Sequence, residues 1–361
     1  MHWYGMIRCI IVMLFFMVAA PGPGMAQTLY PARNGAETSR VVTVYSSIDE
    51  AIALPLIDAF RDANPTIAVR YVEAQTVDIY ERVVQESDAG KPTADIAISS
   101  AMDLQMKLAN DGYARRISSF ASGQWPKWAN WRDSAIGLTY EPAVIVYHKP
   151  DFVAAPPPQT RAELEQYLRA NSNDLQGRIG TYDIERAGVG LLFLARDIEN
   201  HRDIWSLVRA MGGAGVKLYS TSSAILERVA DGRFALGYNI LGSYAAEWAK
   251  THPDIGIVMP RDYTVVMTRV AVVPMRAGSP DLGERFLQYL MSPEGQKVMA
   301  EQSGLPAIHP AVDGPNTATA LIRQMGGQLR PAPLTPALMV YLDQAKRGRV
   351  VARWNKELRA R

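Results

Sequence analysis

Small polar side chains stand directly after four apolar runs of the sequence, each of which is typical of a buried β-strand. These positions are Ser46-Ser47, Ser99-Ser100, Thr181-Tyr182 and Tyr238-Asn239. Ligands bind beyond the carboxyl ends of the strands in open parallel sheets, so the four pairs can meet at one site. Helical patterns follow three of the pairs directly, and the free N–H groups at helix starts attract anions. The pattern therefore predicts an anion-binding site, although each Ser or Thr could instead only cap its own helix.

Two arginines and one tyrosine complete the predicted ligand-binding set. Tyr140 precedes an apolar run at 143–147, and Arg269 begins another run at 269–274. Arg186 follows the third polar strand end. An arginine can pair with a phosphate or a carboxylate through two parallel hydrogen bonds. Arg186 follows Asp183 and Glu185, and such a trio after a strand more often forms only the polar rim of a cleft.

The sequence lacks the motifs of catalytic and metal sites. Its five His residues are scattered without an i,i+4 pair, and Gly-x-Ser-x-Gly is absent. The single Cys excludes an internal disulfide framework and a Cys-based zinc site. A net charge of +2, from 38 Lys and Arg against 36 Asp and Glu, gives no electrostatic footprint for nucleic acid. We expect no enzymatic activity, cofactor, metal or nucleic-acid partner, and we expect a monomer.

The elements that must position the candidate residues alternate along the chain. Apolar, β-branched runs at 41–45, 67–72 and 94–98 are separated by helical patterns, which predicts an α/β fold with a parallel sheet. A second α/β unit includes runs at 178–182 and 234–238. The runs that contain residues 143–147 and 269–274 lie on either side of this second unit. One lobe interrupted by another indicates two lobes joined by a hinge of crossing strands, which can close around a ligand.

The first 26 residues have the layout of a secretory signal peptide. Arg8 is followed by the apolar run Cys9–Ala20, and Gly24-Met25-Ala26 supplies small residues before Gln27. Twelve residues would rise only ~18 Å as a helix, less than the ~30 Å of a bilayer core. We therefore expect cleavage, export to the periplasm and a flexible leader over 27–40.

An ordered set of segments resembles the periplasmic solute-binding proteins of ABC importers, in the ferric-iron-type group. The segments are VVTVYSSIDE, KPTADIAISSAMDLQMKLANDGY, LTYEPAVIVYHK, GRIGTYDIERAGVG, RVADGRFALGYNILGSYA and FLQYLMSPEGQKVMAEQSGLPAIHP. The resemblance implies a type II fold of two α/β lobes that captures a solute and delivers it to a membrane permease. The boundaries expected on this basis are 41–138 and 261–330 for lobe 1, 139–260 for lobe 2 and 331–361 for a C-terminal helical segment.

The resemblance also bears on the ligand. Ferric-binding members use a His and a Glu on the first lobe and paired Tyr residues on the second. Here Ile48 and Asp49 occupy the first loop, and Tyr238 is followed by Asn239. The segments GTYDIERAGVG and GYNILGSYA are more similar to the branch that binds phosphorylated sugars, phosphoglycerates or phosphonates, which implies a small anionic organic solute.

Other functions remain open on the sequence alone. The stretch LTPALMVYLDQ resembles relatives that work beside sensor kinases, so a periplasmic sensory protein reporting to a histidine kinase is one alternative. A ferric-iron-binding protein is another. A periplasmic hydrolase would need a nucleophile–base pair or a metal, and no motif for either occurs.

Overall fold

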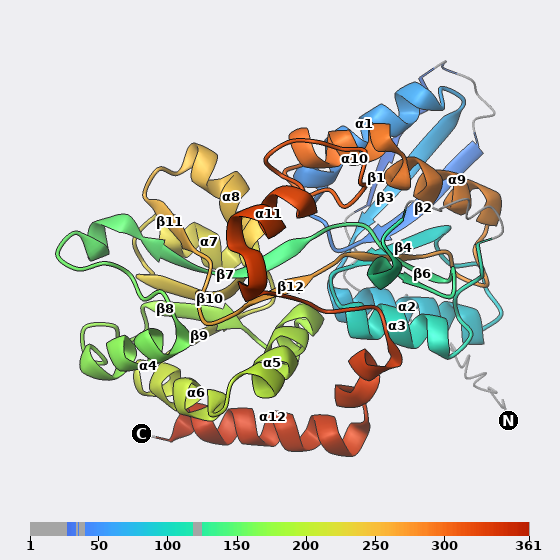
Figure 1. Cartoon of the computed structure of the whole chain (residues 1–361). Coiled ribbons are helices and arrows are strands. Elements are labelled where there is room, and N and C mark those ends of the chain that lie inside the picture. Colours follow the sequence, from blue (N-terminus) through green and yellow to red (C-terminus); the bar gives the residue numbers. More distant parts are fainter. Residues whose placement is uncertain (1–26, 34, 36–39, 118–124, 361) are drawn as a thin grey trace, which may run out of the picture.

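The computed structural model describes residues 27–33, 35, 40–117 and 125–360, and the expected signal peptide at 1–26 lies outside them. The chain forms two seven-stranded sheets with helices packed on their faces, which confirms the predicted two-lobed α/β fold (Figure 1). No helix in these described ranges is both long enough and apolar enough to cross a lipid bilayer.

The first lobe is built on a sheet of strand order β1-β3-β2-β4-β13-β6-β5. Its parallel centre consists of β2 (Arg40–Ser46), β3 (Ile67–Glu73) and β4 (Ile96–Ser99), close to the runs predicted from the sequence. The later strands are β13 (Val270–Val272), antiparallel to β4, then β6 (Ala135–Gly137) and β5 (Asn130–Trp131).

Alternating side chains of β2 enter two different cores. Val44 packs with residues of α1 (Glu50–Ala63), α9 (Pro280–Met291) and α10 (Pro293–Glu301) on one face of the sheet. Tyr45 packs on the other face with α2 (Thr76–Asp88) and α3 (Met102–Asn110). Burial on both faces explains why the sequence of β2 reads as a continuous apolar run.

The segment expected to be a flexible leader differs from that expectation at its start. β1 (Gln27–Tyr30) pairs antiparallel with the edge of β3. The guanidinium of Arg61 also binds this segment, because its Nε donates to the carbonyl of Pro31 over 2.9 Å. A four-residue edge strand with only two half-buried side chains has almost no apolar pattern, so it could not be recognised from the sequence alone.

The second lobe contains the strand order β14-β12-β7-β10-β8-β9, with β11 paired to β7. Its strands are β7 (Glu141–His148), β8 (Ile179–Tyr182), β9 (Lys217–Tyr219), β10 (Leu236–Leu241), β11 (Ile255–Val258), β12 (Thr264–Met267) and β14 (Leu329–Pro331). Its helices are α4 (Arg161–Ala170), α5 (Gly188–Asn200), α6 (Ile204–Gly213), α7 (Ser222–Ala230) and α8 (Gly242–Thr251).

The chain crosses between the sheets at 138–140, from β6 to β7, and at 268–269, from β12 to β13. The two crossings are bonded to each other. Leu138 N donates to Arg269 O over 2.8 Å, and Thr139 N donates to Thr268 Oγ1 over 3.1 Å. The two crossings lie at the start of, or directly before, the runs 143–147 and 269–274 that the sequence indicated on either side of the second lobe.

The C-terminal part touches both lobes. After α11 (Ala318–Met325) the chain adds β14 to the second sheet, and the 3₁₀ helix η4 (Pro336–Tyr341) then packs against α3 of the first lobe. The last helix, α12 (Gln344–Arg359), lies along α6 of the second lobe (Figure 1). The remaining 3₁₀ helices are η1 (Lys127–Ala129), η2 (Lys149–Phe152) and η3 (Gly326–Gln328).

Candidate functional site

A polar cleft lies between the two lobes and contains about 450 Å³ of empty space, part of it open to solvent. The first lobe lines it with Ser47, Asp49, Glu73, Ala74, Gln75, Thr76 and Ser100, and the second lobe with Tyr182, Val189, Ser220, Thr221, Ser222, Leu241 and Tyr244. Most of these residues lie at or beside the starts of α1, α2, α3, α5, α7 and α8, and Glu73 and Tyr182 end β3 and β8. The first N–H groups of a helix have no acceptor within the helix. Side chains already accept from some of them, as Glu73 does from Glu50 N and Thr76 from Gly188 N.

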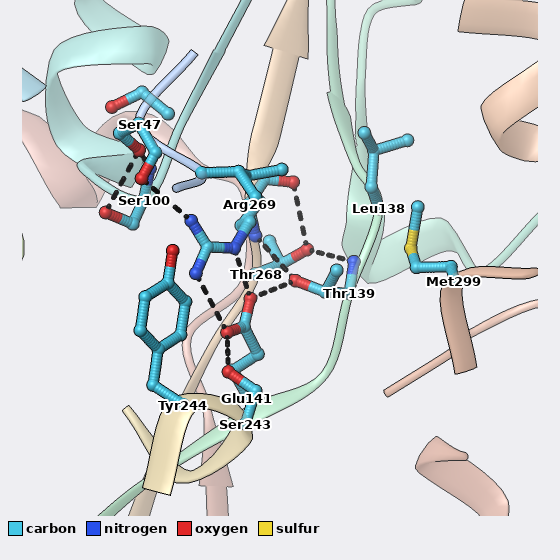
Figure 2. Close-up of polar contacts among 12 residues, drawn as sticks. Ser47, Ser100, Leu138, Thr139, Glu141, Ser243, Tyr244, Thr268, Arg269 and Met299 are labelled. Atoms are coloured by element: carbon cyan, nitrogen blue, oxygen red, sulfur yellow. Dashed lines mark hydrogen bonds and ion pairs between the residues drawn. The ribbon is translucent and has the colours of Figure 1, made fainter. Parts of the chain in front are cut away.

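Ser47 and Ser100 lie together at the first-lobe wall, as the sequence predicted for neighbouring strand ends. The Oγ of Ser47 accepts from Ser100 N over 3.1 Å, and the two hydroxyl oxygens are 3.5 Å apart (Figure 2). The preceding serines are directed elsewhere. Ser46 Oγ accepts from Ile48 N over 3.1 Å and Ser99 Oγ from Ala101 N over 3.2 Å, so both hydroxyls satisfy the backbone behind the wall.

Tyr182 and Thr181 also occupy different places. Tyr182 lines the cleft, and its hydroxyl shares a short hydrogen bond with Ser222 at the start of α7. Burial raises the pKa of Tyr182 to about 12, which keeps this hydroxyl protonated. Thr181 instead donates its hydroxyl to Tyr238 O over 3.1 Å and thereby ties β8 to β10.

Tyr238 and Asn239 belong to a buried network behind the cleft wall. The Tyr238 hydroxyl and the Asn239 amide both donate to Asp197 Oδ2, over 2.8 and 2.7 Å. The same carboxylate pairs with the fully buried Arg161 over 3.1 Å. Asn239 has a φ of 58°, at the point where the register of β10 against β7 shifts. These contacts hold the irregular end of β10 in place and leave both side chains outside the cleft lining.

Arg269 lies at the hinge, beneath the cleft. Its Nε donates to Glu141 Oε1 over 2.9 Å and its Nη2 to Glu141 Oε2 over 3.2 Å (Figure 2). Both side chains are buried, with exposed fractions of 1% and 0%. Burial alone would lower the pKa of Arg269, but the carboxylate of Glu141 raises it above the usual value. The third guanidinium nitrogen points to the carbonyl of Ser47 at 3.4 Å, so Arg269 supports the cleft wall from below.

The remaining two predicted residues lie away from the cleft. Tyr140 is buried in the first-lobe core, with its ring 5.7 Å from that of Trp128. Arg186 is exposed in the turn before α5 and is not among the cleft-lining residues. The structure therefore brings Ser47, Ser100 and Tyr182 together in the cleft.

Two carboxylates in the cleft were not among the residues predicted from the sequence. Glu73, at the end of β3, accepts a hydrogen bond from Glu50 N over 2.8 Å, and burial raises the pKa of Glu73. Asp49 binds two second-lobe hydroxyls, those of Tyr244 and Ser223. Asp49 stands after a strand like the predicted serines, so the same positional signal could have found it. No Lys or Arg is among the described residues that line the cleft.

No group of three or more His, Cys, Asp or Glu side chains in the described part of the chain is arranged to hold a metal ion. The cleft therefore offers hydroxyls, helix-start N–H groups and two carboxylates as its contacts. This chemistry suits reversible hydrogen bonding of a small polar molecule.

Solved structures include several with the same architecture. A substrate-binding protein of an ABC transporter from Agrobacterium tumefaciens is 57% identical, with a TM-score of 0.91 over 94% of this chain and 100% of that one. The fructose-6-phosphate-bound AfuA from Actinobacillus pleuropneumoniae is 13% identical, with a TM-score of 0.71 over 90% of this chain and all of that one. Iron-bound HitA from Pseudomonas aeruginosa is 16% identical, with a TM-score of 0.66 over 88% and 99%. The last two likenesses concern the fold alone.

A comparison with curated proteins finds no significant match. Residues 55–322, well over half of the chain, match the sequence family described as bacterial extracellular solute-binding protein. With the two lobes, the hinge and the polar cleft between them, this match shows that the chain belongs to the bacterial extracellular solute-binding proteins.

Proposed function

We propose that this protein is the periplasmic receptor of an ABC importer and captures a small anionic organic solute between its lobes. The observation that carries the proposal is the cleft itself, where six helix starts from both lobes converge on one polar space. The 57% identity to a substrate-binding protein of an ABC transporter supports the transport role.

The chemistry of the cleft favours a solute that carries both hydroxyl groups and an anionic group. Helix-start N–H groups and the hydroxyls of Ser47, Ser100 and Ser222 can donate to a phosphate or a carboxylate. The carboxylates of Asp49 and Glu73 can only accept while ionised, so they suit the hydroxyls of a sugar or glycerate. A phosphorylated sugar, a phosphoglycerate or a hydroxylated phosphonate combines these groups.

One observation favours a second candidate. Asp49 and Glu73 place two carboxylates in a cleft whose described lining has no Lys or Arg. An amine-bearing solute would be attracted to them by charge. However, both carboxylates already accept protein hydrogen bonds, which reduces what they offer to a cation.

A thermal-shift screen followed by calorimetry separates the two candidates. The panel contains hexose phosphates, phosphoglycerates, phosphonates, ferric citrate, thiamin and a polyamine. A solute at 100 times its dissociation constant should stabilise the protein by ~2.7 kcal/mol if it binds only the folded state. We expect this response from a phosphorylated or phosphonate solute. Binding of only thiamin or the polyamine would support the amine-bearing candidate and overturn the anionic one.

The transport role has a test of its own. A strain that lacks this protein should lose uptake of the solute identified by calorimetry, and the parent chain should restore it. Unchanged uptake in the deletion strain would contradict the receptor role even if the solute binds.

A further inference from the structure

We infer that Asp49 is a latch that holds the two lobes closed. Its carboxylate lies on the first lobe, and both of its oxygens bind side chains of the second lobe. Tyr244 donates its hydroxyl to Asp49 Oδ1 over 2.8 Å, and Ser223 donates its hydroxyl to Oδ2 over 2.7 Å. The Asp49 N–H bonds the same Tyr244 oxygen over 3.0 Å. Three hydrogen bonds thus cross the cleft at one residue.

The start of α1 shows that the carboxylate is free for this role. Asp49 occupies the N-cap position of α1, where an Asp side chain usually accepts from the first-turn N–H groups. Here its side chain makes no capping hydrogen bond. The first N–H of the helix, that of Glu50, is instead bound by Glu73 at the end of β3 over 2.8 Å. The carboxylate of Asp49 is thereby available for the opposite lobe.

Tyr244, which binds the Asp49 carboxylate from the second lobe, is in contact with the hinge. The ring of Tyr244 lies against the guanidinium of Arg269, which is 5.2 Å from the ring centroid. Arg269 is bound to Glu141 on the other crossing strand, and Ser243, the neighbour of Tyr244, also donates to Glu141 (Figure 2). Tyr244 is therefore fixed in the second lobe by the hinge, so it presents its hydroxyl to Asp49 only when the lobes are close together.

The hydrogen bonds of Asp49 would determine which fraction of the molecules is in the closed form. The apparent affinity of a receptor for its solute scales with the fraction of molecules in the binding-competent state. Each hydrogen bond to the Asp49 carboxylate forms across the cleft, so it stabilises the closed form and contributes nothing to the open one. Loss of one such bond should lower the closed-to-open ratio by about tenfold.

Small-angle X-ray scattering without solute tests the latch, and its outcome does not depend on which solute the protein binds. The variants are Ser223→Ala, Tyr244→Phe and Asp49→Ala. Each should raise the radius of gyration above that of the parent, with Asp49→Ala giving the largest increase. The matched control is Ser220→Ala, because Ser220 also lines the cleft but makes no side-chain hydrogen bond across it in the described part of the chain.

A double-variant cycle separates a latch from a local structural role. Ser223→Ala should raise the radius of gyration in the parent but have no further effect in the Asp49→Ala background. If Asp49→Ala does not fold, Ser223→Ala and Tyr244→Phe alone decide the matter. A radius of gyration equal to that of the parent in both hydroxyl variants would overturn the proposal, as would equal effects of Ser223→Ala in both backgrounds.

Discussion

Neighbouring serines at the end of β4 have opposite surroundings, and this difference yields a test of the binding site. Ser100 lines the cleft, whereas Ser99 bonds the backbone of Ala101 behind it. We expect Ser100→Ala to weaken solute binding about 10-fold or more, because a hydrogen bond to a charged group contributes roughly 1.5–3 kcal/mol. Ser99→Ala should lower the free energy of unfolding by ~1 kcal/mol, because the N–H of Ala101 loses its acceptor, and leave the affinity nearly unchanged. Calorimetry and urea unfolding on both variants make the comparison, and equal affinities would place the site elsewhere.

A buried carboxyl makes the stability of the fold depend on pH. Asp103 on α3 is 2% exposed, and burial raises its pKa from 3.8 to about 7. The pKa of Asp103 is higher in the folded protein than in the unfolded chain. The stability that the protonated carboxyl contributes is therefore complete below the pKa of the unfolded chain and is lost as the pH rises through about 7. Asp103→Asn removes this dependence.

The free energy of unfolding of Asp103→Asn, measured relative to that of the parent, should increase with pH. Relative to the parent, Asp103→Asn should gain roughly 3 kcal/mol in free energy of unfolding between pH 5 and pH 8. Urea denaturation at the two pH values measures the gain. A difference between variant and parent that is the same at both pH values would show that this carboxyl does not titrate in the range.

At the residue scale the sequence could identify only part of the cleft. Ser47, Ser100 and Tyr182 were found because they follow buried strands, which is a local signal. Tyr238 and Asn239 have the same signal, but the bulge in β10 and the carboxylate of Asp197 direct them into a buried network. Arg269 is a candidate ligand-binding residue on the sequence alone, because its partner Glu141 is far away in the sequence. The direction of a side chain and its pairing with a residue distant in sequence depend on the tertiary structure, so they cannot be inferred from the residues at one strand end.

At the scale of elements, strands buried on both faces could be predicted from the sequence, whereas exposed edge strands could not. The central strands β2, β3 and β4 are nearly continuous apolar runs because both of their faces are covered, and the sequence located each within a few residues. The short edge strands β1, β5 and β14 have two to four residues and mostly exposed or half-buried side chains, so their pairing could not be predicted. Their positions are set by the neighbouring strand rather than by their own pattern.

The start of α5 packs so closely on the first lobe that it requires glycine. Gly188 N donates to Thr76 Oγ1 over 2.9 Å, and a Cβ at this position would lie 2.7 Å from Ala101 Cβ. Thr76 and Ala101 belong to the first lobe. Gly188→Ala should therefore hold the lobes apart, raise the radius of gyration and weaken solute binding at least tenfold.

A second glycine serves as the control for this prediction. Gly213 ends α6, and a Cβ there would meet no atom within 4 Å. Gly213→Ala should keep the affinity and raise the free energy of unfolding by up to ~1 kcal/mol, because alanine favours a helix. Scattering and calorimetry on both variants suffice. Unchanged scattering for Gly188→Ala would mean that the lobes accommodate the methyl group by local adjustment.

At the scale of the whole molecule, the two lobes are joined by crossings that contain a buried ion pair. Arg269 on one crossing and Glu141, the first residue of β7 directly after the other, are almost completely removed from solvent. Thr139 donates to Glu141 over 2.7 Å, and Ser243 donates to it from the second lobe. The pair therefore connects both crossings with the start of α8 and, through the Ser47 carbonyl, with the cleft wall.

Breaking this pair should destabilise the protein strongly. Glu141→Gln leaves the guanidinium of Arg269 buried without its counter-charge, which we expect to cost ~3–5 kcal/mol in free energy of unfolding. The exposed pair Arg233–Glu227 is a matched control, since its side chains are 51% and 57% exposed. Glu227→Gln should cost no more than ~1 kcal/mol. Urea unfolding of both variants measures the contrast, and similar small costs would contradict a buried, desolvated pair at the hinge.

A double variant then separates stability from positioning. Glu141→Gln combined with Arg269→Met removes both charges and keeps similar volumes, so most of the lost stability should return. Solute affinity should not return, because methionine can neither donate to the Ser47 carbonyl nor fix the ring of Tyr244. Recovery of both stability and affinity would show that the ion pair contributes only to packing at the hinge. Recovery of stability alone would show that the charges were retained to align the cleft with the two crossings.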